Sequence, residues 1–326
     1  MGQNSVAAGD SDETPKTPKN LGDMPDEIVS LIIRRSDFKE QLILRKTSKT
    51  LRALVDNEKP ACTHLSIMYY PDGIMCEYDY YRAAFFSPGM EIEEFQAQNI
   101  HCHGFVQTDN YEERAFRDFE ITLRNPKLRL EKLEISHTFY ISQLLMEPIN
   151  HRVFVRELEL TALSPSCFLS ILPFLRPGVL KKITIRTNNF RWSADAMHPV
   201  ARLEQWIRCE EMHLHWSLER FPMEYAQHFK RFLILEGDID DTKFVRFRNY
   251  LCGLQNFEEC TLVCMGLVTK REKIQRLMGA LIDSDGMDKI FHSTYHYRIP
   301  ETNYYLEMKL WEDTIRIDIL KKKYSN

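Results

Sequence analysis

A spacing of apolar residues recurs six times along the 326-residue chain, and it constrains the fold more than any other feature. Each copy has an apolar residue, two further residues, a second apolar residue, one further residue and a third apolar residue. Because successive side chains of a strand point to opposite faces, each copy predicts a short strand buried on one face. The copies are Leu130/Leu133/Ile135, Val155/Leu158/Leu160, Leu180/Ile183/Ile185, Cys209/Met212/Leu214, Phe229/Phe232/Ile234 and Phe257/Cys260/Leu262.

Segments with helical periodicity separate these copies, and the steps between central residues are 25, 25, 29, 20 and 28 residues. One strand and one helix in about 20–29 residues is the signature of leucine-rich repeats, which stack into a solenoid around a parallel sheet. The usual Asn after the strand is missing and the lengths vary, so we expect an irregular α/β solenoid. The alternative is a non-repeating α/β domain in which the spacing arises by chance. Weaker copies are Cys62/Leu65/Ile67 and Ile92/Phe95/Ala97, and the helical patterns are Ile141/Leu144/Leu145, Phe168/Leu169/Leu172, Phe244/Phe247/Leu251/Leu254 and Ile274/Leu277/Met278/Leu281.

Residues 21–52 carry more apolar surface than so short a segment can bury. Pro25 and the acidic residues after it predict the start of a helix, and Asp37 with Glu40 predicts a capping box that opens a second one. At roughly 100° per residue, the aliphatic residues of the first helix cover about 200° of its surface. About 40 residues cannot bury that much surface alone. We therefore expect one side of this segment to pack within the chain and another to pack on a partner.

The same residues resemble the F-box, a three-helix domain that docks onto the Skp adaptor of SCF (Skp–cullin–F-box) ubiquitin ligases. Leu51 departs from the family pattern, in which Trp is frequent. The resemblance implies a Skp-family partner and, through it, a cullin; the alternative is an ordinary three-helix subdomain that caps a larger fold. The implied Skp-binding residues are Leu21, Met24, Pro25, Ile28, Val29, Leu31, Ile32, Leu42, Leu44, Arg45 and Leu51.

A later segment, residues 128–266, is similar to the FTH domain that follows nematode F-boxes. The similarity rests on the turn from Leu172 to Gly178, on Gln205-Trp206 and on His228-Phe229. It implies a domain that recognises a target or partner protein, without catalytic residues to carry over. The predicted organisation is a disordered tail (1–20), an F-box (21–60), connecting α/β repeats (61–127), the FTH domain (128–266) and a C-terminal helix and β-hairpin cap (267–326), with Lys321 to Lys323 as a solubilising end.

Composition and motifs limit the remaining functions. A net charge of −4 argues against a nucleic-acid surface, and no apolar run reaches the roughly 20 residues of a membrane helix. The eight cysteines form no C-x₂-C pair, which favours reduced thiols in a cytoplasmic or nuclear protein and excludes a RING domain. We find no enzyme motif, and the triplet His101-Cys102-His103 is too weak to indicate a metal site. We therefore expect no catalysis, cofactor or metal.

Target recognition is predicted on the outward face of the strands, which the apolar triplets leave free. The early strands present charges there, whereas the strand around Leu233 is apolar on both faces. An outward apolar spot indicates an interaction site, and the alternative is that the C-terminal hairpin covers it. The candidate target-binding residues are Glu134, Glu159, Thr184, His213, Leu233, Leu235 and Val263. The predicted function is a substrate receptor of an SCF ligase, and the alternative is a scaffold that binds Skp or a target without a ligase.

Overall fold

The computed structural model divides the chain into two compact units, Met1–Ala61 and Cys62–Asn326. It describes residues 20–70, 73–90, 102–136, 150–161, 164–186, 192–215, 221–237, 239–264, 275–283, 292–311 and 316–324. Several predictions lie outside these residues: residues 1–19 of the predicted tail (1–20), the weak copy Ile92/Phe95/Ala97, the helical pattern Ile141/Leu144/Leu145, His101 and Ile274. None of the described helices is long and apolar enough to cross a membrane.

The first unit is built from three helices that follow a short 3₁₀ turn. The predicted capping box is confirmed: Asp37 accepts a hydrogen bond from the Glu40 N–H at 2.8 Å, and Glu40 accepts one from the Asp37 N–H at 3.0 Å. Ser48 caps the third helix by accepting from the Leu51 N–H at 3.1 Å. The elements are η1 (Leu21–Asp23), α1 (Asp26–Arg35), α2 (Phe38–Thr47) and α3 (Lys49–Asn57).

The core of this unit is small and is supplemented by one buried amide. Val29, Ile33 and Leu51 form its centre. Gln41 is buried in α2 and donates to the Ile33 carbonyl at 2.9 Å, while its own carbonyl accepts from the Ala61 N–H at 2.9 Å. Gln41 thereby satisfies a helix-end carbonyl and anchors the chain that leaves α3.

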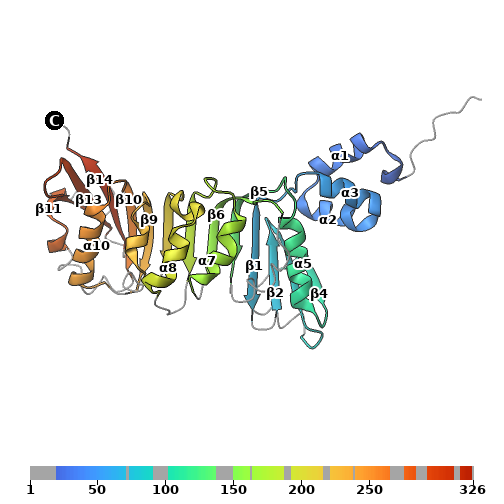
Figure 1. The fold of residues 1–326 in the computed structure, drawn as a ribbon, viewed down its shortest axis with the longest axis horizontal. Helices are drawn as coiled ribbons and strands as arrows, with labels where there is room; N and C mark the ends of the chain where they lie inside the picture. Colours follow the sequence, from blue (N-terminus) through green and yellow to red (C-terminus); the bar gives the residue numbers. More distant parts are fainter. Residues whose placement is uncertain are drawn as a thin grey trace, which may run out of the picture. The chain divides into compact units, whose positions relative to one another are not determined.

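The second unit contains a mixed sheet of fourteen described strands (Figure 1). Its order is β11-β12-β13-β14-β10-β9-β8-β7-β6-β5-β1-β2-β3-β4. The strands from β5 to β10 are parallel and follow chain order. β1, β2 and β3 pair antiparallel with one another, as do β11 to β14, while β1 pairs parallel with β5 and β3 pairs parallel with β4. The chain is therefore an α/β protein with a large mixed sheet. The strands are β1 (His64–Tyr70), β2 (Gly73–Tyr78), β3 (Tyr81–Phe86), β4 (Gly104–Gln107), β5 (Arg129–Ile135), β6 (Phe154–Thr161), β7 (Lys182–Arg186), β8 (Glu211–His215), β9 (Arg231–Glu236), β10 (Glu259–Cys264), β11 (Ala280–Asp283), β12 (His292–Arg298), β13 (Tyr304–Trp311) and β14 (Arg316–Lys323).

The helices between these strands lie on one side of the sheet, as α7, α8 and α10 show in Figure 1. All residues of the six apolar triplets are buried, which confirms that each strand turns these positions inward. Trp206 packs among them, with ring centroids 6.0 Å from Phe168 and 5.2 Å from Phe229. The helical elements are α5 (Tyr111–Leu123), α7 (Ser166–Ile171), η2 (Leu172–Phe174), α8 (Ala194–Ala201), α9 (Glu204–Ile207), η4 (Met223–Ala226) and α10 (Asp241–Gly253).

The C-terminal strands extend the sheet beyond its parallel part. β13 and β14 pair antiparallel, as the alternating sequence predicts, and β14 pairs edge to edge with β10. The prediction that Lys321 to Lys323 form a solubilising tail is wrong, because β14 extends to Lys323. Lys321 donates to the Leu254 carbonyl at the end of α10, at 2.6 Å, and Lys322 pairs with Glu307 at 2.9 Å. A cation at the C-terminus of a helix is stabilised by the carbonyls there.

Two expectations about helices fail for identifiable reasons. The pattern that includes Leu169 predicts a buried side chain, but Leu169 is exposed because α7 turns Cys167, Phe168 and Ile171 to the core instead. The pattern that ends at Leu281 predicts a helix, but β11 begins at Ala280. Gly279 precedes it with φ of 105°, a conformation that stops a helix and that L-residues rarely adopt.

Gly279→Ala is expected to destabilise the second unit by about 2–3 kcal/mol, because the added Cβ would collide with the backbone carbonyl of His296 at an unfavourable φ. Gly253→Ala is the matched control, since a Cβ there meets open space. Urea unfolding followed by tryptophan fluorescence measures both variants. Equal stability of Gly279→Ala and the wild type would contradict the assigned backbone.

Candidate functional site

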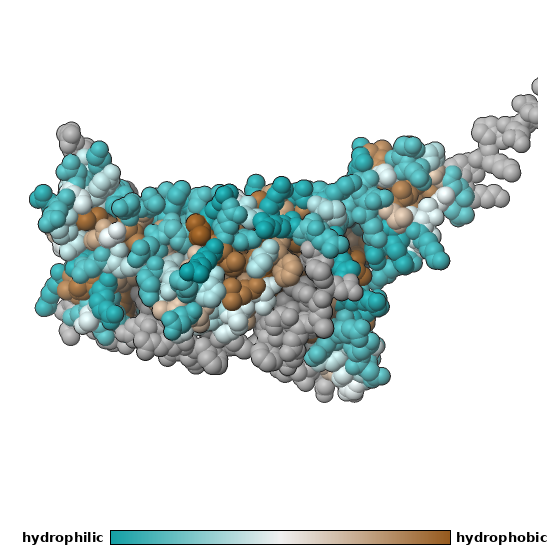
Figure 2. All heavy atoms as spheres, in the orientation of Figure 1, coloured by the Kyte–Doolittle hydropathy of each residue, from teal (hydrophilic) through white to brown (hydrophobic). Residues whose placement is uncertain are grey.

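Four aliphatic side chains of α1 and α2, here called the aliphatic row, remain exposed on the first unit. α1 turns Val29 and Ile33 into the core, which leaves Ile28 and Leu31, both 47% exposed, and Ile32 on its other side. Ile43 of α2 is 55% exposed. Figure 2 shows hydrophobic residues at the surface of these helices. Large apolar side chains gathered on so small a unit indicate an interaction surface.

The structure sorts the predicted Skp-binding residues into three groups. Val29 and Leu51 are core residues, so they hold the helices in place and leave no surface for a partner. Arg45 is engaged within the unit, because its guanidinium pairs with Asp56 at 2.6 and 3.2 Å. The exposed residues are Pro25, Ile28, Leu31 and Ile32, and the half-buried ones are Leu21, Met24, Leu42, Leu44 and Arg45.

Sequence reasoning missed Ile43, the most exposed aliphatic residue of the row. The sequence does indicate an exposed aliphatic residue here, because Leu42, Ile43 and Leu44 are consecutive. A helix cannot turn three successive residues to one core. α2 buries Phe38 and Gln41 instead. Ile43 is left on the outside.

A second candidate surface is the face of the sheet opposite the helices, here called the open face. One row of residues in register across the parallel strands is charged, and the sign of the side-chain charge alternates from strand to strand. Lys182 pairs with Glu157 at 2.6 Å, and Arg231 pairs with Glu211 at 3.2 Å. In strand order the row is Lys132, Glu157, Lys182, Glu211, Arg231 and Glu259.

Two carboxylates of this face, Glu159 and Glu211, are held ionised by their neighbours. Burial alone would raise the pKa of Glu159, but hydrogen bonds from Lys132 and Arg186 outweigh it, so the pKa is lowered. The hydrogen bond with His213, followed by that from Arg231, lowers the pKa of Glu211 to about 2 against the effect of burial. Most of the charge on the open face is therefore neutralised within the chain.

The predicted target-binding residues all lie on the open face, but they differ in accessibility. Glu159 and Thr184 are buried at its base, and Glu134 and His213 are half-buried. Leu233, Leu235 and Val263 are half-buried and lie in adjacent register on β9 and β10. The alternative that the C-terminal hairpin covers them does not hold, because β14 continues the sheet beside β10.

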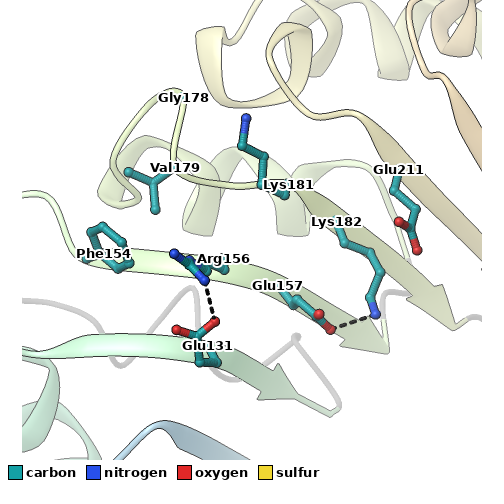
Figure 3. A pocket seen from close by; sticks show the side chains of 9 residues that line it. All are labelled: Glu131, Phe154, Arg156, Glu157, Gly178, Val179, Lys181, Lys182 and Glu211. Atoms are coloured by element: carbon teal, nitrogen blue, oxygen red, sulfur yellow. Dashed lines mark hydrogen bonds and ion pairs between the residues drawn. The ribbon is translucent and has the colours of Figure 1, made fainter.

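A shallow pocket of about 490 Å³ opens at one end of this face. The turn at Gly178, with φ of 77°, forms one wall, and Phe154 and Val179 supply apolar surface (Figure 3). Arg156 pairs with Glu131 at 3.2 Å. The two lysines that line the pocket, Lys181 and Lys182, are likewise paired with glutamates. These pairings leave no uncompensated cation to attract an anionic ligand.

The described residues contain no group of three side chains suited to a metal ion. His103 Nδ1 accepts a hydrogen bond from the Arg82 N–H at 3.2 Å, so this ring has a structural contact. The eight cysteines are free thiols, and burial raises the pKa of those at Cys76 and Cys260. Buried, protonated thiols are poor nucleophiles and metal ligands.

Comparison with protein families finds two domains in the chain. The F-box domain model matches residues 21–62, which hold the exposed aliphatic row, and the FTH domain model matches residues 137–279. The chain is an F-box protein with a C-terminal FTH domain. No curated protein matches it. The F-box implies binding to a Skp-family adaptor and, through it, to a cullin, and the FTH match includes β6 to β10 of the open face.

Glu211→Gln is expected to lower the free energy of unfolding by about 1–2 kcal/mol near neutral pH, because a lowered carboxyl pKa stabilises the folded state above the unfolded pKa of about 4.3. That contribution is lost as the pH falls through about 4 towards 2, so the wild type and the variant should converge there. Urea midpoints measured across this range provide the comparison. Glu259→Gln, at the exposed end of the same row, is the control. If Glu211→Gln were less stable than the wild type by the same amount in acid as at neutral pH, the pairing of Glu211 with His213 and Arg231 would be disproved.

Proposed function

We propose that this F-box protein is the substrate-receptor subunit of an SCF ubiquitin ligase. In this proposal the F-box binds a Skp-family adaptor, the adaptor joins a cullin, and the FTH domain holds a target protein. The observation that carries it is the aliphatic row of α1 and α2, exposed within the segment that the F-box model matches. Burial of such side chains is the main source of affinity in a stable interface.

The adaptor-binding surface proposed here is narrower than the sequence pattern. Its centre is Ile28, Leu31, Ile32 and Ile43, with Pro25 and the half-buried Leu21, Met24, Leu42 and Leu44 at its edge. Val29 and Leu51 support it from the core, and Arg45 supports it through its pair with Asp56. Substitutions at the core positions are expected to act on folding first and on binding only as a consequence.

Target recognition is proposed for the open face of the FTH domain. Its parallel strands and intervening helices support a description as irregular leucine-rich-repeat-like units. Leu233, Leu235 and Val263 provide apolar contact, and the paired charges around them favour one orientation of a target. An unknown protein substrate, rather than a nucleic acid or a membrane, is the partner in this proposal.

The proposed role is not catalytic. A receptor that holds a target lysine beside a conjugating enzyme accelerates transfer by proximity and orientation, which need no reactive group on the receptor. The reduced thiols expected for the eight cysteines suit the cytoplasm or nucleus, where such ligases would act.

Leu31→Ser combined with Ile43→Ser is expected to reduce Skp co-purification at least tenfold, because hot-spot truncations cost about 2 kcal/mol or more. Both side chains are largely exposed, so the helical circular dichroism signal should remain. Thr50→Ala, exposed on α3, is the matched control.

The same pull-down separates the receptor from a scaffold. Recovery of Skp together with a cullin supports a ligase subunit, whereas recovery of Skp alone supports a scaffold. Wild-type Skp recovery by the folded double variant would refute the proposed adaptor surface.

A further inference from the structure

Two arginines flank the apolar centre of the open face. Arg186 lies at the end of β7 and Arg316 at the start of β14, with β8, β9 and β10 between them. Arg186 is in register with His215, and Val263 is in register with both Leu235 and Arg316. Because β8 and β9 are also paired in parallel, these residues form one transverse row. In strand order, the row consists of Arg186, His215, Leu235, Val263 and Arg316. An arginine therefore lies at each end, with an imidazole and two aliphatic side chains between.

Each arginine is anchored by its Nε and leaves its terminal amino groups unused. The Arg186 Nε donates to Glu159, and the Arg316 Nε donates to Asp318 at 2.8 Å. The arginine side chains are 50% and 48% exposed, whereas Glu159 and Asp318 are 7% and 19% exposed. Within the described chain, no hydrogen bond engages the terminal N–H groups of either guanidinium. An incoming molecule therefore meets guanidinium groups, with the balancing carboxylates recessed below them.

The surroundings of Arg316 fix its position before any partner arrives. Its guanidinium lies 5.6 Å from the centroid of the Trp311 ring. Asp318, which holds its Nε, is itself fixed by hydrogen bonds from the Trp311 Nε1 at 2.7 Å and the Thr261 hydroxyl at 2.9 Å. A side chain that is already ordered loses little entropy on binding.

The spacing of the two arginines sets the length of a ligand. Four steps of about 4.8 Å between neighbouring strands place the backbones of Arg186 and Arg316 about 19 Å apart. An extended peptide advances about 3.3 Å per residue, so this distance corresponds to five or six residues. A carboxylate accepts two parallel N–H donors from a guanidinium, which matches the unused groups at both ends. The aliphatic centre calls for an apolar side chain between the two acids.

We propose that the arginine-flanked patch, defined as Arg186, Leu233, Leu235, Val263 and Arg316, binds an extended segment of a target protein that carries two acidic residues five or six positions apart with an aliphatic residue between them. This deepens the target-recognition half of the proposed function and rests on it. The partner is a peptide segment because its acids must be held at a fixed separation across an apolar surface. Free anions provide no such spacing.

The test is a selection of displayed random 12-residue peptides on the purified full-length chain, followed by affinity titration of synthetic copies. We expect the recovered peptides to be enriched in paired acids at the stated spacing with an aliphatic residue between. Arg186→Gln and Arg316→Gln should each weaken their binding about tenfold, since each removes a charge-assisted pair. Raised salt should also weaken it, because the groups are exposed.

Arg246→Gln is the matched control, because this exposed arginine lies on α10, on the helical side of the sheet. If a glutamine variant unfolds, Arg186→Lys and Arg316→Lys keep the charge and should still weaken binding through loss of the bidentate geometry. Failure to recover peptides, peptides without paired acids, or equal affinity of the arginine variants would overturn the inference. These outcomes are independent of Skp co-purification, which depends on the F-box variants.

Discussion

The burial of one apolar row in register across β5 to β10 and β14 is the constraint on which the second unit depends. The register partners across six parallel strands are Leu133, Leu158, Ile183, Met212, Phe232 and Cys260, and Ile319 continues the row into the antiparallel strand β14. A slip of one residue in any strand would turn its apolar side chains to the open face and its charges to the core. The same row therefore fixes the strand order, the side that the helices cover and the content of the open face.

The electrostatics of the open face follow from that register. Once the inner positions are fixed, basic side chains and glutamates of neighbouring strands meet at hydrogen-bonding distance and neutralise one another. Isolated exposed pairs contribute little to stability, but like charges at these positions would repel and so disfavour other registers. The face that results has little free charge. Its distinguishing features are the half-buried aliphatic spot and the two arginines whose terminal groups lack described partners.

Much of this arrangement could be predicted from local patterns, and the exceptions depend on contacts distant in sequence. The triplets gave the buried face of each strand, and Asp37 with Glu40 gave the start of α2. Arg316 reaches the side of Val263 only because β14 pairs antiparallel with β10, which no local pattern encodes. The limits of the F-box surface were likewise not predictable. A residue such as Val29 has the same sequence signal whether its helix turns it to the core or to a partner.

In this account the two units bind different partners. The F-box exposes an aliphatic row that binds the adaptor, and the open face of the second unit binds a target. Hydrogen–deuterium exchange of the full chain, with and without a purified Skp-family adaptor, tests this division most directly. The account predicts slowed exchange in α1 and α2 on adding the adaptor, with β6 to β10 unchanged. Slowed exchange in those strands, or no change in α1 and α2 while the adaptor is bound, would contradict it.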